Sequence, residues 1–391
     1  MHFERLPGGA PPLVFVHGFA CSHTDWQAQI AHFRSRNATI AIDLRGHGGT
    51  PGAPADCSIE TYGADVGALL DELKLERTVL VGHSMGCRVV LEAYRRAPQR
   101  IAGLVLIDGS RAATGNPAAA EDSVRKTLSE TDYSLFARKF FADMFFANAD
   151  LALKTRAIEQ ALRLPRLIGK SLFPRIARWD AGEMDAALAA VRVPLLAIQS
   201  TYLNSARVRI AIKPGETSPW IELLRARVPR ARIELITGVG HFPQLEAADR
   251  VNALVEDFCV QLAHERRGRT GFAELIGLRH VSHGAGTSRF EVQTGEQHFN
   301  PQGVVHGGLA FALADTGTGS ALWTLLERGE GCATIEMKIS YLKPPQPGRL
   351  VCDSRVLHRE GNIATIESEV RSGDEVIARA VAVYAIFPAR R

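Results

Sequence analysis

The sequence predicts two domains of different fold class: an α/β domain with a largely parallel sheet, then an α+β domain with an antiparallel sheet. The chain has 391 residues, which is too long for one small core and suits two domains. Its first part alternates short, continuous apolar runs with helical periodicity, as in a parallel sheet that helices cover on both faces. Beyond residue 270 the segments alternate apolar and polar residues, as antiparallel strands do.

Composition excludes several classes of protein. The formal net charge is +4 and no block of lysine or arginine is long, which disfavours a nucleic-acid partner. No run of about 18 uncharged apolar residues is present, so no membrane span is expected. The N-terminal segment "MHFERLPGGAPP" lacks the apolar stretch of a signal peptide, and the six cysteines show no metal-ligand spacing. We therefore expect a cytoplasmic protein without a metal or other cofactor.

The α/β domain is expected to contain six buried parallel strands. These are the runs "PLVFVHG", "ATIAIDL", "RTVLVGHS", "AGLVLIDG", "VPLLAIQS" and "RIELITG". Between the fourth and fifth runs lies a long stretch with helical periodicity and many phenylalanines and leucines. It predicts an inserted helical cap over about residues 111–190, the alternative being an ordinary helical excursion.

A nucleophile motif follows the third run. In "LVGHSMGCR", Ser84 stands between Gly82 and Gly86, after a strand and before a helix. This G-x-S-x-G pattern permits the tight turn that lifts a serine hydroxyl out of the sheet. The earlier "VFVHGF" places the amide of Phe19 where, together with the amide of Met85, it could bind an oxyanion.

Histidines recur in these motifs. In "GVGHFPQLE", His241 follows the last strand, which is the place for a general base. His17, His47 and His83 also lie in the motifs. We interpret His83 as a packing or pocket residue and His47 as structural.

Together, "VHGF", "DLRGHGGT", the serine turn and "GHFPQLE" make residues 10–262 resemble the α/β-hydrolase superfamily. The resemblance implies a Ser–His–acid triad, but the acid is missing from its usual place. After "VPLLAIQS" the sequence offers Leu203 or Asn204. Asp108, one strand earlier, is the candidate acid, and its alternative role is to cap the next segment. The resemblance also implies that the sheet starts near the family's third strand.

The boundary between the domains is expected near Arg267, so that the first domain covers residues 1–265 and the second residues 270–391. Five segments beyond it read as antiparallel strands: "SRFEVQT", "ATIEMKISYL", "RLVCDSRVLHREG", "NIATIESEV" and "EVIARAVAVYAIF". One apolar helix, expected from Gly308 to about Glu327, interrupts them and carries Asp315. A buried carboxylate costs several kcal/mol unless it has a partner or a task.

The segments "GFAELIGLRH", "HFNPQGVVHGGLAFALADTGTGSA" and "ATIEMKISYLKPPQPG" make residues 270–389 resemble hotdog-fold acyl-CoA thioesterases of the phenylacetate-pathway (PaaI-like) branch. In that fold a sheet wraps one long helix, and two subunits form each active site. The resemblance places the family's functional positions on five residues: Asn300, His306, Gly307, Asp315 and Thr334. It implies that Asp315, from the opposite subunit, is the general base or nucleophile on the thioester.

The chemistry of these residues agrees with the resemblance. Gly307 and Gly308 lie at a helix N-terminus, whose free amides and dipole suit an oxyanion, and Asn300 adds a side-chain donor. His306 is expected to hold the loop and touch the thioester. Strand alternation places Thr334 opposite the apolar residues 335, 337, 339 and 341, facing either substrate or water.

The combined expectation is a bifunctional hydrolase: an N-terminal serine hydrolase of an ester or thioester, fused to an acyl-CoA thioesterase. We expect a homodimer or homotetramer through the second domain. The alternative is an acyl-CoA-binding dimerisation module fused to a non-catalytic α/β-hydrolase-like scaffold.

Overall fold

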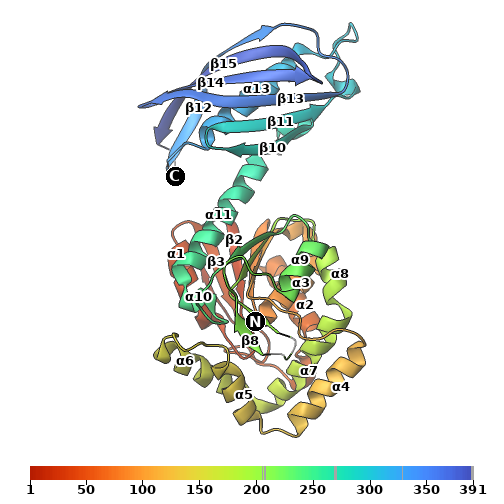
Figure 1. Cartoon of the computed structure of the whole chain (residues 1–391), viewed down its shortest axis with the longest axis vertical. Coiled ribbons are helices and arrows are strands. Elements are labelled where there is room, and N and C mark those ends of the chain that lie inside the picture. The colour runs from red at the N-terminus through yellow and green to blue at the C-terminus, as the bar shows by residue number, and fades with distance from the viewer. Residues whose placement is uncertain (205, 207, 268–270, 328, 389–391) are drawn as a thin grey trace. The chain divides into compact units, whose positions relative to one another are not determined.

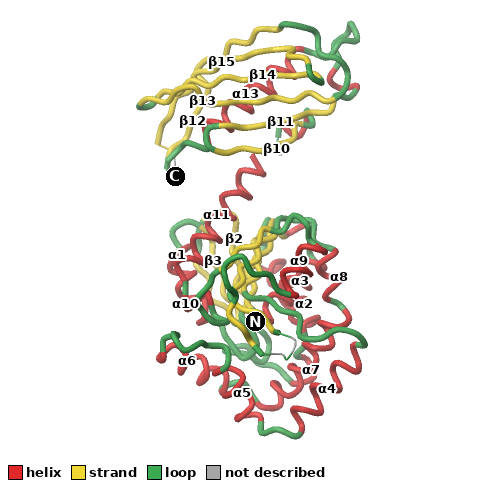
Figure 2. Tube along the Cα trace, in the orientation of Figure 1, coloured by secondary structure: helices red, strands yellow, loops and turns green. Residues whose placement is uncertain are grey.

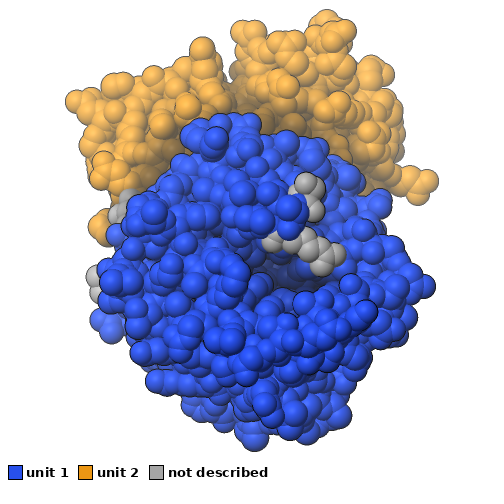
Figure 3. Space-filling model, turned by 60° about the horizontal axis from the view of Figure 1, so that its bottom comes forward, with its two compact units in different colours: residues 1–262 blue, residues 263–391 orange. Residues whose placement is uncertain are grey.

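The computed structural model describes residues 1–204, 206, 208–267, 271–327 and 329–388. The chain divides into two compact units, residues 1–262 and residues 263–391, which we call unit 1 and unit 2 (Figure 3). The division falls within helix α11 (Ala248–Arg267), close to the boundary expected near Arg267. No helix among the described residues is long and apolar enough to cross a membrane.

Unit 1 is built on a seven-stranded sheet of order β1-β3-β2-β4-β5-β6-β9 (Figure 1). The strands are β1 (Phe3–Leu6), β2 (Gly9–Val16), β3 (Asn37–Ile42), β4 (Thr78–His83), β5 (Ile101–Ile107), β6 (Leu195–Gln199) and β9 (Arg232–Leu235). All neighbours are parallel except β1, which pairs antiparallel with β3. The six predicted strands are present, and β1 is an edge strand that the sequence analysis missed.

Apolar side chains of these strands point to both faces of the sheet. Val14 and Val16 of β2 belong to one buried cluster, whereas Leu13 and Phe15 belong to a cluster on the other face. This two-sided burial explains why the strands are continuous apolar runs and not alternating ones. Outside the cap, the described α-helices of unit 1 are α1 (Gln27–Phe33), α2 (Ile59–Glu72), α3 (Met85–Arg96), α9 (Pro219–Arg227), α10 (Pro243–Glu246) and α11.

The stretch between β5 and β6 is helical, as the cap prediction requires. Its helices are α4 (Pro117–Ser129), α5 (Tyr133–Ala142), α6 (Leu151–Leu162), α7 (Arg166–Gly182) and α8 (Met184–Ala189). Asn116, Asp132 and Asp150 start α4, α5 and α6, because each side chain accepts a backbone N–H three residues on. Figure 2 shows α4 to α7 grouped at one end of unit 1.

A small hairpin follows β6 directly. Strands β7 (Thr201–Leu203) and β8 (Arg209–Ala211) pair antiparallel, with Leu203 opposite Arg209. The side chain of Asn204 builds the turn between them, because its Oδ1 accepts the amides of Ala206 and Val208. The position where the family resemblance places an acid is therefore occupied by a turn.

Unit 2 is a six-stranded antiparallel sheet of order β10-β11-β13-β14-β15-β12, with α13 against one face. Its elements are α12 (Phe272–Leu275), β10 (Leu278–Gly284), β11 (Thr287–Gln293), α13 (Gly307–Trp323), β12 (Glu330–Tyr341), β13 (Arg349–Glu360), β14 (Ile363–Ser372) and β15 (Glu375–Pro388). The five expected strands are present and β10 is additional. The helix ends earlier than the expected Glu327.

A bulge in β12 overturns the predicted face of Thr334. Thr334 is opposite Tyr384 and Glu336 is opposite Val383, so Ile335 is an extra residue in the ladder. A bulge resets the alternation of a strand, because one residue is left out of the pairing. Thr334 consequently faces α13, and the assumption of one uninterrupted alternation from 334 to 341 was wrong.

Candidate active sites

The turn from β4 into α3 holds Ser84 in a strained backbone conformation. Its φ is 55° and its ψ is −111°, outside the regions that non-glycine residues favour. The turn demands glycine at residue 86, since a Cβ there would lie 2.2 Å from the carbonyl oxygen of Val16. The backbone N–H of Ser84 donates to the carbonyl of Ile107 at 3.0 Å, which anchors the turn to β5.

Three of the predicted residues form one hydrogen-bonded chain. The Ser84 hydroxyl lies 2.8 Å from Nε2 of His241, and Nδ1 of His241 lies 2.6 Å from Oδ2 of Asp108. Because an ionised Asp108 only accepts, Nδ1 carries the proton and Nε2 is free to accept from the serine. His241 and Asp108 are fully buried. Of the acid positions considered, the structure brings Asp108 to the histidine and leaves Asn204 in the hairpin turn.

Asp108 is held by more donors than the sequence indicated. Its Oδ1 accepts the amides of Ser200 and Thr201 at 2.8 and 2.7 Å, and its Oδ2 accepts the Thr201 hydroxyl at 2.5 Å. Arg209 lies 3.4 Å from the same Oδ2. Burial alone would raise the pKa of the carboxyl, but these contacts, the His241 hydrogen bond foremost, hold the pKa of Asp108 below its ordinary value.

Burial, followed by the charge of Arg209, lowers the pKa of His241 to about 4, and the hydrogen bond to Asp108 opposes this shift. The imidazole is therefore neutral at pH 7 and able to accept a proton. Thr201 and Arg209 were missed from sequence, because nothing in "TYLNSARVR" marks them as partners of an aspartate one strand away.

The other motif histidines act through backbone contacts. Nε2 of His83 lies 2.7 Å from the carbonyl oxygen of His241, which it can only meet as a donor. His17 joins the ends of two strands: its Nε2 accepts the amide of Leu44, and its Nδ1 donates to the carbonyl of Gly18. Burial lowers the pKa of His17 to about 4, so it stays neutral in this role. His47 lies 3.2 Å from the carbonyl of Arg45 through Nδ1.

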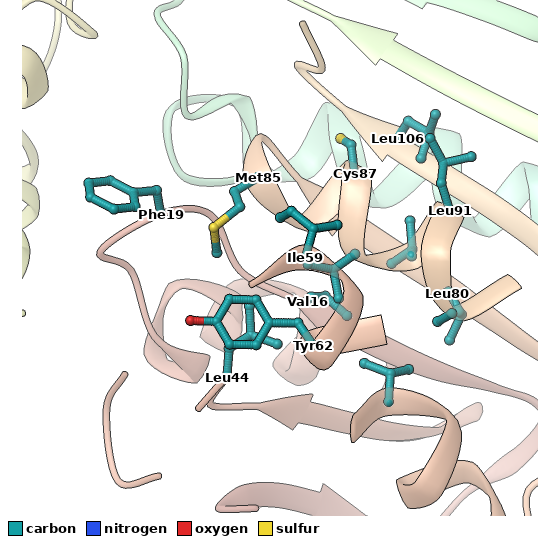
Figure 4. Close-up of a cluster of buried hydrophobic side chains, with 14 of the residues drawn as sticks. Val16, Phe19, Leu44, Ile59, Tyr62, Leu80, Met85, Cys87, Leu91 and Leu106 are labelled. Atoms are coloured by element: carbon teal, nitrogen blue, oxygen red, sulfur yellow. The ribbon is translucent and has the colours of Figure 1, made fainter. Parts of the chain in front are cut away.

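Phe19 and Met85, the predicted oxyanion residues, line the same cavity as Ser84 and His241. Within the described part of the chain, neither backbone N–H has a hydrogen-bond acceptor. Figure 4 shows both side chains at the edge of a buried apolar cluster that also contains Val16. Met85 begins α3, so its free amide also carries the positive end of that helix.

The cavity above Ser84 is large and mostly apolar. Its volume is about 740 Å³ and it extends between the sheet end and the cap. Aromatic side chains dominate its wall, with six phenylalanines from the cap: Phe136, Phe140, Phe141, Phe145, Phe146 and Phe173. Such a lining suits a bulky apolar or aromatic group.

A buried ion pair joins the serine turn to the cap. Arg88 of α3 contacts Asp180 of α7 through two hydrogen bonds of 2.6 and 2.7 Å. The same guanidinium donates to the carbonyls of Ser84 and Ser110, and Asp180 also accepts the amide of Ala112. A charged residue one turn after the nucleophile was the only sequence signal for this pair.

Outside the active site, one group among the described residues combines metal-ligand side chains: His2, His23 and Asp43. Hydrogen bonds already account for it. The two Nδ1 atoms lie 2.8 and 2.9 Å from Asp43 oxygens, and the amides of His23 and Gly49 donate to the same carboxylate. We assign this group a structural role at the edge of the sheet.

In unit 2, the loop before α13 is held by the predicted polar residues. Oδ1 of Asn300 accepts the amides of Gln302 and Val304, so its side-chain NH2 is the part left for a ligand. His306 caps the helix, because its Nδ1 accepts the amide of Gly308 at 2.9 Å. The carbonyl of Gly307 accepts the Tyr341 hydroxyl at 3.2 Å.

Asp315 is partly exposed in the single chain. The sequence analysis had assumed a buried carboxylate, so this expectation was wrong for the single chain. Its Oδ1 accepts the Thr334 hydroxyl at 2.9 Å. Its backbone carbonyl receives the hydroxyls of Thr318 and Tyr384, at 3.0 and 3.1 Å. The structure therefore brings Asp315 and Thr334 together. Within the described residues no hydrogen bond joins Asn300 or His306 to Asp315.

Each half of the chain matches the model of a known protein family. Residues 13–254 match the model described as the alpha/beta hydrolase family, and residues 302–378 match the model described as the thioesterase superfamily. The first match covers more than half of the chain.

Individual relatives align with unit 1. An acetyltransferase component of the acetoin cleaving system from Pseudomonas putida is 30% identical over 264 residues, 64% of this chain and 64% of that protein. The chain thus spans slightly less than two thirds of that relative. A pimeloyl-[acyl-carrier protein] methyl ester esterase from Nitrosomonas europaea is 26% identical over 252 residues, 63% of this chain and 94% of that protein. A solved thermophilic esterase from Thermogutta terrifontis shares the fold, with a TM-score of 0.56 and 24% identity over 67% of this chain and 93% of that one.

Proposed function

The chain belongs to the alpha/beta hydrolase family, and its second unit carries a thioesterase-superfamily segment; from this premise we propose that it is a hydrolase with two hydrolytic sites. Unit 1 is proposed to be a serine hydrolase of an ester or thioester with a bulky apolar group. Unit 2 is proposed to hydrolyse acyl-CoA thioesters as a homodimer or homotetramer.

The hydrogen-bonded chain of Ser84, His241 and Asp108 carries the proposal for unit 1. His241 takes the hydroxyl proton at Nε2 as Ser84 attacks the carbonyl carbon, and returns it to the leaving group. Asp108 keeps the other ring proton on Nδ1 and stabilises the imidazolium that forms. Water then hydrolyses the acyl-enzyme by the same proton transfers.

Two further features support this mechanism. The unpaired amides of Phe19 and Met85 border the cavity at Ser84, where the tetrahedral oxyanion would form. The phenylalanine lining favours an aromatic or extended aliphatic acyl group. The similarity to a pimeloyl-[acyl-carrier protein] methyl ester esterase agrees with an ester as substrate.

For unit 2, the start of α13 and its second turn supply complementary groups. The amide of Gly307 and the side-chain NH2 of Asn300 are the donors proposed for the thioester oxyanion, with His306 holding the loop. Asp315, oriented by the Thr334 hydroxyl, is proposed as the general base or nucleophile. Since these groups share no hydrogen bond within the described part of one chain, we propose that the carboxylate serves the donors of a second subunit.

Exposed apolar side chains near these groups favour a second copy as the partner. Phe311 of α13 and Ile335 of β12 are 41% and 59% exposed, and Tyr341 is 54% exposed. β12 is also an edge strand, and its unpaired backbone groups can pair with another chain. The competing interpretation is an acyl-CoA-binding dimerisation module fused to a non-catalytic scaffold. The argument for a scaffold was the missing acid of unit 1, and the structure offers Asp108 for that role.

The proposal for unit 1 is tested with three substitutions in an Asp315→Ala background, which silences unit 2. Ser84→Ala should abolish hydrolysis of p-nitrophenyl esters and labelling by a fluorophosphonate probe. Asp108→Asn should lower kcat by up to about 10⁴, as expected when the histidine loses its orienting carboxylate. Asn204→Ala, the matched control in the hairpin turn, should change the rate little.

Normal ester hydrolysis by Asp108→Asn would show that the triad is assigned incorrectly. Wild-type Ser84 that fails to react with the probe would favour the scaffold interpretation.

A further inference from the structure

The hairpin β7–β8 stands where the sequence lacks an acid, and it points two side chains at the acid that is present. Thr201 and Leu203 lie on one face of β7, and Arg209 is opposite Leu203, so Thr201 and Arg209 share that face. Nη1 of Arg209 donates to the Thr201 hydroxyl oxygen at 2.7 Å, and that hydroxyl donates to Oδ2 of Asp108. The guanidinium also lies 3.4 Å from Oδ2.

The same oxygen of Asp108 also accepts the ring proton of His241. We propose that Arg209 is a positioning residue of unit 1 that fixes Asp108 from the hairpin and, by its charge, sets the lowest pH at which His241 can act as a base. This inference rests on the proposed serine hydrolysis by unit 1. It adds a residue that neither the serine motif nor the family resemblance marks.

Burial makes the charge of Arg209 effective. Its side chain is only 9% exposed and borders the cavity above Ser84. Arginine stays protonated even when buried, so it must have a compensating anion. Within the described part of the chain, Asp108 is the carboxylate paired with it. Arg209 and the imidazolium of His241 therefore compete for one negative charge, which disfavours protonation of His241.

Two other cations that line the cavity have carboxylate partners of their own. Arg88 of α3 is paired with Asp180, and Lys139 in the cavity wall is paired with Asp143. Two further groups approach from β4 and α10. Burial lowers the pKa of His83 far below its ordinary value, and Glu246 accepts the amides of Gly240 and Phe242. Arg209 is thus distinguished by having the triad acid itself as its counter-ion.

The test measures how fast a fluorophosphonate probe labels Ser84 in the full chain between pH 3.5 and 9, using brief exposures, for wild type, Arg209→Met and Arg209→Lys. Labelling requires neutral His241, so its acid limb reports the pKa of the base. A charge within about 4–6 Å of a titrating group shifts the pKa of that group by about 1–3 units. We expect the acid limb of Arg209→Met to lie at least about one pH unit above that of wild type. The acid limb of Arg209→Lys, which keeps the charge, should lie close to that of wild type. Lys126→Met, which removes an exposed cation of α4 that does not line this cavity, should leave the limb in place.

A purely structural role for Arg209 predicts a different result: slower labelling at every pH with an unmoved limb. An unmoved limb in folded Arg209→Met would overturn this inference and leave the proposed function of unit 1 standing. The same holds if Arg209→Lys and Arg209→Met have equal limbs. If Arg209→Met does not fold, Arg209→Gln provides the uncharged comparison, with the same expected shift. A wild-type chain that is not labelled at any pH would overturn the proposed function of unit 1 and this inference with it.

Discussion

Asp315 is the side chain for which we propose a role in an assembly that the single chain does not contain. It lies on an alanine-rich helix but remains partly exposed, with Thr334 as the hydroxyl donor to its carboxylate. A charge that is not fully desolvated costs the monomer little. The single chain can therefore tolerate this carboxylate without a catalytic role. The argument for a catalytic role is the hydrogen bond by which Thr334 orients the carboxylate.

Replacement of this carboxylate tests the proposed thioesterase. We predict that Asp315→Ala, in a Ser84→Ala background, lowers kcat for release of CoA from acyl-CoA by about 10²–10⁴, the range for loss of a general base. The chain should stay folded, because alanine is favoured in helices and Asp315 has no buried cationic partner among the described residues. Thr334→Val should have a smaller effect. Thioesterase activity of Asp315→Ala within a few-fold of its parent would exclude the assigned role.

Residue identity could be predicted from sequence where the chemistry is local. Ser84 is set by a motif of adjacent residues, and His241 by its place after a strand. The choice between Asp108 and residues 203–204 stayed open, because it depends on which strand end faces the histidine. Thr201 and Arg209 could not be predicted, since their contact with Asp108 spans a hairpin whose strands are only three residues long.

At the scale of elements, the Arg88–Asp180 pair makes the cap part of the hydrolase core. It links α3, directly after Ser84, to α7 of the cap, and both side chains are buried. Removing one partner of a buried ion pair leaves an uncompensated charge and costs about 3–5 kcal/mol. We predict that Asp180→Ala destabilises unit 1 by about this amount.

Urea unfolding followed by tryptophan fluorescence would measure the effect, because Trp26, Trp179 and Trp220 all lie in unit 1. The double variant Arg88→Met/Asp180→Leu is the matched control: it removes both charges and should recover much of the loss. Equal stability of wild type and Asp180→Ala would mean that the cap does not depend on this pair.

The elements that the sequence analysis missed have a common reason. β1 and β10 are edge strands with polar or half-exposed residues, so they lack the apolar pattern by which buried strands are identified. The face of Thr334 was wrong because a one-residue bulge interrupts β12. Periodicity predicts a regular element, whereas bulges and edges are decided by the neighbouring chain.

On the scale of the whole molecule, the two units are separately packed and each contains its own candidate site. Buried clusters fill both faces of the unit 1 sheet, and others lie between α13 and the unit 2 sheet. The triad of unit 1 is joined within one chain. In unit 2 the oxyanion donors and the carboxylate have no such connection among the described residues, and apolar side chains near them are exposed. Unit 2 is thus the part of the molecule for which we propose self-association, and oligomers of one chain are usually closed and two-fold symmetric.

A shared site makes a strong prediction about mixtures of inactive chains. In a Ser84→Ala background, Asn300→Ala and Asp315→Ala chains should each have little thioesterase activity. After subunit exchange, each mixed dimer regains one site with both Asn300 and Asp315, which gives about a quarter of the wild-type rate for a random two-fold mixture. The control partner is the double variant Asn300→Ala/Asp315→Ala, which cannot complete a site with Asn300→Ala.

Light scattering should report at least twice the chain mass for every variant, because the exposed apolar residues of α13 and β12 remain in place. A monomeric chain would contradict the shared site directly. The shared site would also be contradicted if the mixture of Asn300→Ala and Asp315→Ala chains stayed inactive while labelled subunits were seen to exchange. Both halves of the proposed site would then be present in one dimer without producing turnover. Asn300 and Asp315 of the same chain would in that case have to act together, which would require a different arrangement of the loop before α13.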